Sequence, residues 1–493
     1  AASLSRALTA LEAHEREGRP LEATGLVSVL RSAARLSGAD GAAGELPGAL
    51  ACWLRPRLLA ELPRCSPRQL ASALLDLHTL RLLDGPALGR LRQEVERCAR
   101  SQQLRPRDLV ALMSGYARLP RPSDDIRACM LPLVPQVIRQ MSECSGPDLI
   151  QLLHGVASVH LRNRKLLGAW ASQFKKLAAG LTPTQLALAT ADLAKVRYVQ
   201  DPHDTFKAAL SSIADVCSML GGLSVCHVVC AMARVGGQGV WEHLPDSQRL
   251  LLCRLEAQVL DRMSELQPQG ISASAAAFAK LRHYSEGLFD GFARAAVPRL
   301  GSFKPEDFAM LSNALSVTHQ VLPAQSWRGE PLEALGCHAA QSLAVSRSAW
   351  SSRQVAEVIQ PFAVLSVPHG ALLHAVESHF RGNTAAYAPR DVVRLLHGFR
   401  ETGYLRESQV VHFWGTAQSR LRLFTGLQML SLARVLADAC AGSPTLSGDF
   451  RGRFYAVAAR LARSVDDMPP ESLCEVAAIW ARVGLRDWQL LSA

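Results

Sequence analysis

Phe278-Ala279-Lys280-Leu281 is one copy of a four-residue phrase that decides the fold of this chain. The phrase holds an apolar residue, a small residue, a basic residue and a second apolar residue. Variants of it recur twelve times, at intervals of 37 to 47 residues. Self-similarity of this period is typical of stacked-repeat proteins rather than of a compact catalytic domain. Other close copies are Tyr116-Ala117-Arg118-Leu119, Leu193-Ala194-Lys195-Val196, Met232-Ala233-Arg234-Val235 and Trp480-Ala481-Arg482-Val483.

A second landmark lies ten residues before the phrase, where several copies carry proline. Proline is favoured in the first turn of a helix, because its missing N–H would have no partner there. We call this position the anchor and number the repeats 1 to 12 from it. Ser66, Thr182 and Ser351 precede their anchors and are suited to cap the helix. The anchors are Ala23, Pro67, Pro106, Gly146, Pro183, Gly222, Pro268, Pro305, Ser352, Pro389, Gly426 and Pro470.

Apolar residues recur 3, 6 or 7, 10 and 13 positions after each anchor, which is one face of an α-helix of about four turns. A helix breaker follows, and a second amphipathic segment completes the repeat. Neither helix can bury its apolar face alone. We therefore predict an all-α fold, an α-solenoid of stacked helical hairpins forming a superhelix as a single continuous array from residue 1 to 493. Second segments are Leu88 to Cys98, Leu131 to Met141, Leu166 to Leu177 and Leu288 to Leu300.

Breakers and insertions mark the connections between these helices. The breakers include Pro120-Arg121-Pro122, Asp201-Pro202 and Gly236-Gly237, and the longer repeats hold insertions at 236–246, 323–331 and 441–448 that we expect to form loops. The chain begins at Ala1 without methionine, and only thirteen residues follow Trp480. We expect either a removed presequence or a fragment of a longer chain, with the last repeat truncated.

The composition favours helices and a basic surface. Hydrophobic residues make up 48% of the chain but aromatic residues only 6%, and the net charge is +11. Only 7 of the 54 basic residues are lysine. Arginine binds phosphate bidentately and stacks on bases, which suits an RNA partner. Codon usage in a GC-rich genome explains the same bias, so the charge favours nucleic acid without deciding the matter.

Most other classes of function find no support. Twelve cysteines are scattered without a CxxC pair, and Cys226 and Cys230 lack a second ligand pair, so we expect buried thiols rather than zinc. No run of about twenty apolar residues predicts a membrane span. Gly236-Gly237-Gln238-Gly239 lacks the lysine of a phosphate-binding loop, and no HExxH or GxSxG occurs. We expect no enzyme activity, no metal and no cofactor.

Basic residues recur at two exposed positions of the first helix. Position 12 after the anchor carries Arg35, Arg118, Lys195, Arg234, Lys280 and Arg482, and position 1 carries Arg68, Arg107, Arg353 and Arg390. On a helical wheel both positions lie opposite the apolar stripe, so stacking would align them as a basic ladder suited to single-stranded RNA. The alternative is an ordinary solvated helix face. Six repeats interrupt the ladder at position 12 with Thr79, Ser158, Val317, Val364, Glu401 and Asp438.

The densest basic cluster lies between Arg162 and Leu177. Arg164 and Lys165 are candidate phosphate contacts within it. Trp170 and Phe174 lie in the same segment. We interpret them as core residues of a second helix rather than as a platform for stacked bases.

These repeats resemble the octotricopeptide and heptatricopeptide repeat proteins, which are related to the FAST-kinase-like and RAP-domain proteins. The resemblance rests on the anchor proline, the leucine three positions later and the phrase with its Lys or Arg. It implies an RNA-binding protein of mitochondria or plastids that acts on organellar transcripts or ribosomal RNA. No RAP module is visible, so no nuclease-like activity is carried over.

The sequence therefore predicts a non-catalytic organellar protein that contacts RNA phosphates through a basic face. A component of the mitochondrial ribosome or a stabiliser of ribosomal RNA is the leading interpretation, with other proteins of a ribonucleoprotein assembly as further partners. The interruptions of the ladder support this setting, because a protein held in a large assembly needs shape and phosphate contacts more than a strict reading of bases. The alternatives are a protein-binding scaffold in a large organellar complex and a factor for messenger-RNA processing or translation.

Overall fold

Helices make up most of the described part of this chain. The computed structural model describes residues 9–13, 16–17, 21–39, 48–101, 104–119, 123–198, 205–236, 246–319, 321–322, 326–442, 452, 455–457, 460–461, 463 and 468–483. Within these ranges there are α-helices and short 3-10 turns but no strand. The predicted all-α solenoid of helical hairpins is confirmed.

The contacts divide the chain into two compact halves, Ala1–Arg254 and Leu255–Ala493. The division falls inside helix α14 (Asp246–Asp261). We describe each half by itself, and the predicted continuity of the array across residues 1–493 stays a prediction.

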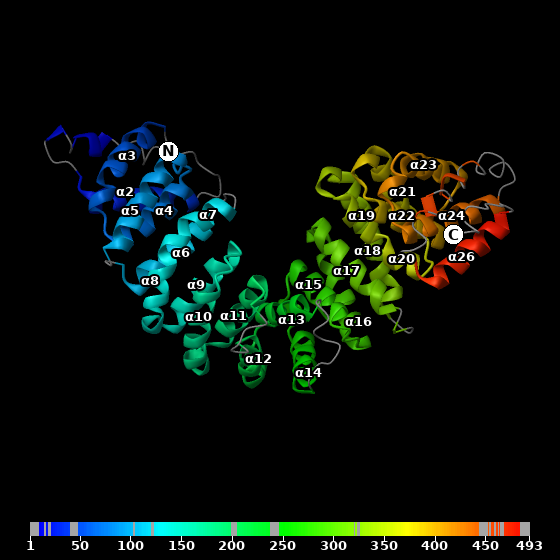
Figure 1. Ribbon diagram of the computed structural model, residues 1–493, viewed down its shortest axis with the longest axis horizontal. Helices are drawn as coiled ribbons and strands as arrows, with labels where there is room; N and C mark the ends of the chain where they lie inside the picture. Colours follow the sequence, from blue (N-terminus) through cyan, green and yellow to red (C-terminus); the bar gives the residue numbers. More distant parts are fainter. Residues whose placement is uncertain are drawn as a thin grey trace. The chain divides into compact units, whose positions relative to one another are not determined.

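A helix begins at every one of the twelve anchors, and these first helices form one layer of each half (Figure 1). In the N-terminal half they are α2 (Ala23–Ala39), α4 (Pro67–Thr79), α6 (Pro106–Ala117), α9 (Gly146–Ser158), α11 (Pro183–Val196) and α13 (Gly222–Gly236). In the C-terminal half they are α15 (Pro268–Lys280), α17 (Pro305–His319), α19 (Ser352–Val358) with α20 (Gln360–Val364), α22 (Pro389–Glu401), α24 (Gly426–Gly442) and α26 (Pro470–Val483).

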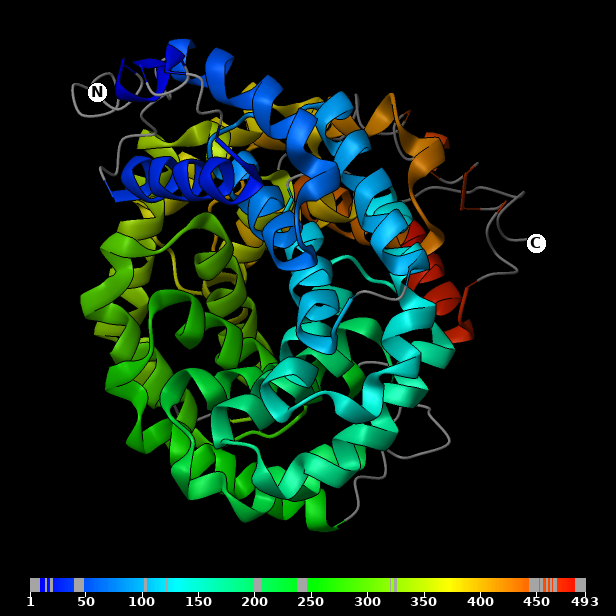
Figure 2. The same ribbon diagram turned by 90° about the vertical axis from the view of Figure 1, so that its left-hand side faces the viewer.

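Second helices form the other layer, and Figure 2 shows the paired helices of the N-terminal half in blue to green. They are α3 (Gly48–Glu61), α5 (Gly85–Arg100), α7 (Ser123–Met130) with α8 (Val134–Arg139), α10 (Arg164–Leu177) and α12 (Thr205–Asp215). The C-terminal half has α16 (Glu286–Ala296), α18 (Glu330–Val345), α21 (Gly370–Gly382) and α23 (Glu407–Gln418). The breakers at 120–122 and 201–202, and the insertion residues 237–245, 323–325 and 443–448, lie outside the described residues. The prediction of a loop at 323–331 is wrong in its described part, because residues 326–331 form a 3-10 turn (Ser326–Arg328) and the start of α18.

The N-terminal ends of the first helices follow the sequence prediction. Ser66, Thr182 and Ser351 each accept a hydrogen bond from the backbone N–H three residues later. The side-chain oxygen of the glutamine at that third position accepts one in turn from the cap N–H. The predicted N-caps are therefore confirmed, as reciprocal capping boxes. Proline also explains a break: Pro361 lies inside the first helix of repeat 9, and without an N–H it divides that helix into α19 and α20.

The C-terminal ends of the first helices share a feature that was not predicted from the sequence. Six first helices end with the residue 14 positions after the anchor in the left-handed conformation, at φ between 53° and 67°. At the end of α15, for example, the Arg282 N–H donates to the Ala279 carbonyl at 3.1 Å, and the His283 N–H donates to the Phe278 carbonyl at 3.1 Å. This is the Schellman pattern. The six residues are Arg81, His160, Arg197, Arg282, Ser366 and Gly403.

The repeated phrase is thus the last turn of the first helix. Its apolar first residue is in the core, as Leu193 and Phe278 show with 0% exposure. Its alanine is buried too, and Ala194 is 1% exposed. The basic third residue is exposed or half-buried, as Lys280 and Lys195 show respectively. The phrase therefore combines packing with a charge directed to the surface.

Neighbouring first helices pack closely where a small residue precedes the phrase. A Cβ on Gly155 would lie 3.4 Å from both the Met113 carbonyl oxygen and the Ser114 Cα. A Cβ on Gly398 would lie 2.9 Å from Ile359 Cδ1. Both glycines stand nine positions after their anchors, and alanine holds that position at Ala277. In these repeats the residue at position 9 therefore limits how near the neighbouring first helices can come.

We expect Gly155→Leu to lower the free energy of unfolding by about 1–3 kcal/mol, because the new side chain must displace backbone of α6. Gly89→Leu is the matched control, since Gly89 lies in α5 with nothing within 4 Å of its Cβ position. That control should stabilise the protein by up to about 1 kcal/mol through helix propensity. Urea denaturation followed by circular dichroism measures both, and equal effects would contradict close packing at position 9.

We expect Ser366→Gly to raise the free energy of unfolding by about 0.5–1 kcal/mol. Glycine adopts positive φ without the steric cost of a Cβ. The free energy gained in this way exceeds the entropic cost of ordering glycine, which is more flexible in the unfolded chain. Gly403→Ala, at the equivalent position of the next repeat, should lower it by about 1 kcal/mol for the same reason. Opposite signs in thermal denaturation support the left-handed helix end, and equal signs would refute it.

Candidate nucleic-acid interface

The predicted ladder residues share one side of the first-helix layer but not one end. Residues at positions 1 and 12 are eleven apart, so they differ by only 20° around the helix but by about 16 Å along it. Arg68 and Arg107 follow the first residue of α4 and α6, whereas Arg118 caps the C-terminal end of α6. The structure therefore separates the ladder into two rows, a position-1 row and a position-12 row. We call the surface that carries both the first-helix face.

In the N-terminal half most of these cations are exposed and without a close counter-ion. Arg68, Arg107, Arg118 and Arg234 are exposed, and none of them forms an ion pair with a described residue. Arg35 is exposed as well, and its charge lowers the pKa of Asp76 against the larger raising effect of burial. Unpaired guanidinium groups at a protein surface keep their hydrogen-bond donors available to phosphate.

Lys195 differs from its neighbours in the position-12 row. Its ammonium group lies 2.9 Å from Asp192 Oδ1, and His154 Nδ1 lies 3.0 Å from the other oxygen of the same carboxylate. Asp192 is 1% exposed, so its charge is partly compensated by these contacts. Lys195 therefore presents less net positive charge than Arg118 or Arg234.

His227 of α13 belongs to the same cluster. Its pKa is lowered, chiefly by burial and then by the charge of Lys195, while Asp192 acts in the opposite direction. The imidazole is therefore neutral at pH 7. This site adds hydrogen-bonding capacity to the first-helix face but no further positive charge.

Arg164 and Lys165 lie in the other layer, at the first two residues of α10. Both are exposed. They start the second helix, so they lie at the end of the hairpin where the first helix finishes. The structure therefore places them at the same end as the position-12 row, on a different helix layer.

The aromatic residues of α10 are core residues, as the sequence predicts. Trp170 and Phe174 are 1% and 0% exposed, and their rings stack with centroids 4.8 Å apart. Trp170 Nε1 donates to the Leu149 carbonyl at 2.9 Å. Neither ring is accessible to a nucleotide base, so α10 can offer phosphate contacts but no stacking platform.

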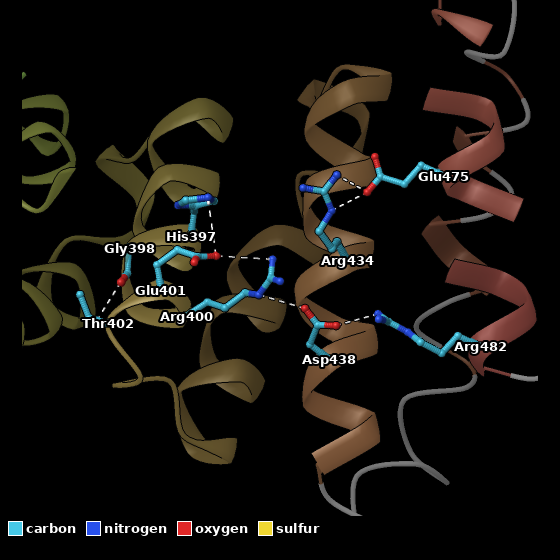
Figure 3. A network of polar contacts seen from close by, with 9 residues as sticks. All are labelled: His397, Gly398, Arg400, Glu401, Thr402, Arg434, Asp438, Glu475 and Arg482. Carbon is cyan, nitrogen blue, oxygen red and sulfur yellow. Dashed lines mark hydrogen bonds and ion pairs between the residues drawn. The ribbon is translucent and has the colours of Figure 1, made fainter. Parts of the chain in front are cut away.

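Several arginines on the first-helix face of the C-terminal half are paired with carboxylates of their own or a neighbouring repeat. Asp438 of α24 joins three successive repeats: Arg400 Nε of α22 lies 2.9 Å from Oδ2, and Arg482 Nη2 of α26 lies 2.7 Å from Oδ1 (Figure 3). Arg434 of α24 is paired with Glu475 of α26 in the same view. These cations already have partners within the protein.

Another two repeats show the same kind of pairing. Glu357 accepts from Arg353 Nε at 2.8 Å and from Arg394 Nη1 of the next repeat at 3.3 Å. Of the remaining predicted contacts, Arg390 and Lys280 are exposed and form no ion pair with a described residue. Two of the four predicted ladder residues in this half, Arg353 and Arg482, are therefore paired with carboxylates.

Sequence reasoning missed the carboxylates that pair with the basic rows. The partners stand at variable positions: 9 for Asp192, 5 for Glu357 and Glu475, and 12 for Asp438. An available signal was an acidic residue on the exposed face of the repeat before or after a ladder arginine. Using it required the register between neighbouring first helices, which the sequence does not state.

Among the described residues, one cluster has the chemistry of metal ligands. Glu333, Cys337 and His369 offer atoms that all lie within 4.8 Å of one another. His369 caps α21, however, and its Nδ1 accepts the Leu372 N–H at 3.2 Å. The proton of the neutral ring therefore lies on Nε2, which faces Cys337 Sγ at 3.6 Å. A protonated Nε2 has no free lone pair to offer a metal. The cluster is therefore better described as a hydrogen-bonded helix cap.

The cysteine pair of α13 lies in the interior. Cys226 is 4% exposed and Cys230 is half-buried. Burial raises the pKa of the Cys230 thiol to about 12, with a further contribution from Cys226. A thiol of this kind stays protonated at neutral pH and is a poor nucleophile and metal ligand.

Comparisons with known proteins add no assignment. No protein-family model matches the chain, and no curated protein matches it. Among the described helices, none is both long and apolar enough to cross a membrane. The case for function therefore rests on the residues and geometry of the first-helix face, together with the resemblance of the repeats.

We expect Asp438 and Arg482 to be coupled by about 0.5–1 kcal/mol in a double-mutant cycle of Asp438→Asn and Arg482→Gln. Both side chains are partly exposed, at 29% and 48%, so solvent screens the pair. Unfolding measurements in 0.05 M and 0.5 M NaCl test the assignment, because the coupling should shrink as salt rises. A coupling of zero at low salt would contradict the network.

Proposed function

We propose that this protein is a non-catalytic organellar RNA-binding protein that holds single-stranded RNA by its phosphates along the first-helix face of the N-terminal half. The observation that carries the proposal is the contrast between the halves. Arg107, Arg118 and Arg234 are exposed and unpaired among the described residues, whereas Arg353 and Arg482 are paired with carboxylates. Phosphate contacts supply most of the affinity of such an interface.

The arrangement favours phosphate binding over base reading. The aromatic residues of the phrase, such as Tyr116 and Phe278, are fully buried, so the last turn of the first helix offers no ring for stacking. Arginine and lysine contacts to phosphate position an RNA without reading its sequence. This is the behaviour suited to a ribosomal-RNA stabiliser or a mitochondrial ribosome component, the setting that the resemblance of the repeats implies.

A second candidate function is a protein-binding scaffold. Leu223, at position 1 of repeat 6, is 69% exposed, as is Met219 just before it. Two exposed apolar side chains beside the basic rows suit contact with a protein. RNA on the basic rows and a protein on these residues are compatible in a ribonucleoprotein assembly.

We expect R107A/R118A/R234A to weaken binding of a fluorescein-labelled 12-nucleotide oligouridine on the order of 100-fold at 0.1 M salt, because each lost phosphate contact removes about 0.7 from the salt slope. Fluorescence anisotropy across a salt series gives both affinity and slope. The matched control is R353A/R400A/R482A, which removes three arginines of the C-terminal half that are paired with carboxylates. It should change affinity by less than about threefold.

Equal losses for the two triple variants would show that charge alone, and not the unpaired face, governs binding. Unchanged affinity and slope in R107A/R118A/R234A would refute the proposed interface. Absence of binding by the wild-type protein to any single-stranded RNA would leave the scaffold as the better proposal.

A further inference from the structure

The residues in the left-handed conformation at the ends of the first helices are mostly basic. Four of the five described non-glycine residues at positive φ are Arg81, His160, Arg197 and Arg282, and all four stand 14 positions after their anchors. Each is exposed, and none has a side-chain hydrogen bond or ion pair with a described residue. Glycine and asparagine are the residues that adopt this conformation readily.

Position 14 completes the interrupted position-12 row. Repeats 2 and 4 interrupt that row with Thr79 and Ser158, and they are the repeats that carry Arg81 and His160 two residues later. Repeats 1, 3 and 6 have their basic residue at position 12. Every repeat that begins in the N-terminal half therefore has an arginine, lysine or histidine at position 12 or 14, and repeat 5 has both Lys195 and Arg197.

The pattern changes in the C-terminal half. Repeat 7 still has both residues, Lys280 and Arg282. Ser366 of repeat 9 and Gly403 of repeat 10 hold the left-handed position with no charge. In these repeats the position-12 row has also lost its basic residues, with Val364 and Glu401 in their place. Repeats 9 and 10 therefore have no basic residue at either position, whereas repeats 5 and 7 have one at both.

Helix electrostatics does not account for this distribution. A cation near the C-terminal end of any helix interacts favourably with its dipole. That benefit would be available to repeats 9 and 10 as much as to repeats 2, 4, 5 and 7. A side chain with a Cβ at positive φ also costs free energy that glycine would avoid. A strained and exposed basic residue that recurs at one structural position points to a ligand with negative charge.

The geometry suits a repeating anion. The Schellman hydrogen bonds fix the backbone at each helix end, and positions 12 and 14 lie within one helical turn of each other. Packed helices lie 8–10 Å apart, so successive repeats would present their cations at roughly that spacing. A single-stranded nucleic acid carries charges that such a row can follow.

We propose that Arg81, His160 and Arg197 form, with the position-12 row, one phosphate-binding edge of the N-terminal half, and that the ligand is the phosphodiester backbone of single-stranded RNA. This inference rests on the proposed function and specifies its residues. The position-14 residues supply the contacts that Thr79 and Ser158 cannot make.

The test uses a substitution that removes the charge and relieves the backbone at the same time. R81G/R197G should be at least as stable as the wild-type protein, yet bind the labelled oligouridine roughly 25-fold more weakly at 0.1 M salt, with a salt slope lower by about 1.4. R81N/R197N is a second variant, since asparagine tolerates positive φ. Ser366→Gly is the matched control and should leave affinity unchanged.

The outcomes separate the two proposals. Wild-type affinity and slope in both double variants would overturn this inference, while loss of binding in R107A/R118A/R234A would still support the proposed function. Weaker binding with thermal stability equal to or above the wild type supports the inference, because misfolding cannot explain it. Absence of RNA binding by the wild-type protein overturns both.

Discussion

The close approach of successive first helices is the constraint on which the rest of this structure depends. At Gly155 a Cβ would be in van der Waals contact with the backbone of the neighbouring helix, and at Gly398 it would press against Ile359. The phrase that follows divides its residues between core and surface. Burial of the apolar residues stabilises each helix pair. The basic residue is left on the exposed side, so the packing that holds the repeats together also sets out their charges in rows.

The two halves use the same scaffold with different electrostatics. In the N-terminal half the rows keep their positive charge, with Asp192 as a local exception. In the C-terminal half, ion pairs cross from one repeat to the next, and Asp438 links three successive repeats. Such partly exposed pairs contribute little stability each. Their larger effect is on the surface potential, which is what distinguishes a surface for RNA from one for protein.

Much of this architecture could be predicted from the sequence, because periodicity and caps are local signals. The twelve anchors start helices, and Ser66, Thr182 and Ser351 cap them as expected. Contacts between repeats could not be predicted, since the pairing of Glu357 with Arg394 depends on how neighbouring helices slide against each other. The left-handed arginines were hidden for another reason: glycine is the usual marker of that conformation, and most of these repeats lack it.

Nearest-neighbour packing also makes the array modular. Within each half a first helix packs against the first helices before and after it, and the interfaces reuse the same positions of the repeat. Stability in such arrays is a sum of repeat and interface contributions. Loss or duplication of one whole repeat would therefore shorten or lengthen the row of cations by one step while preserving every remaining interface. The reach of the basic edge, and so the length of chain it can hold, is free to change by recombination of repeats without redesign of the core.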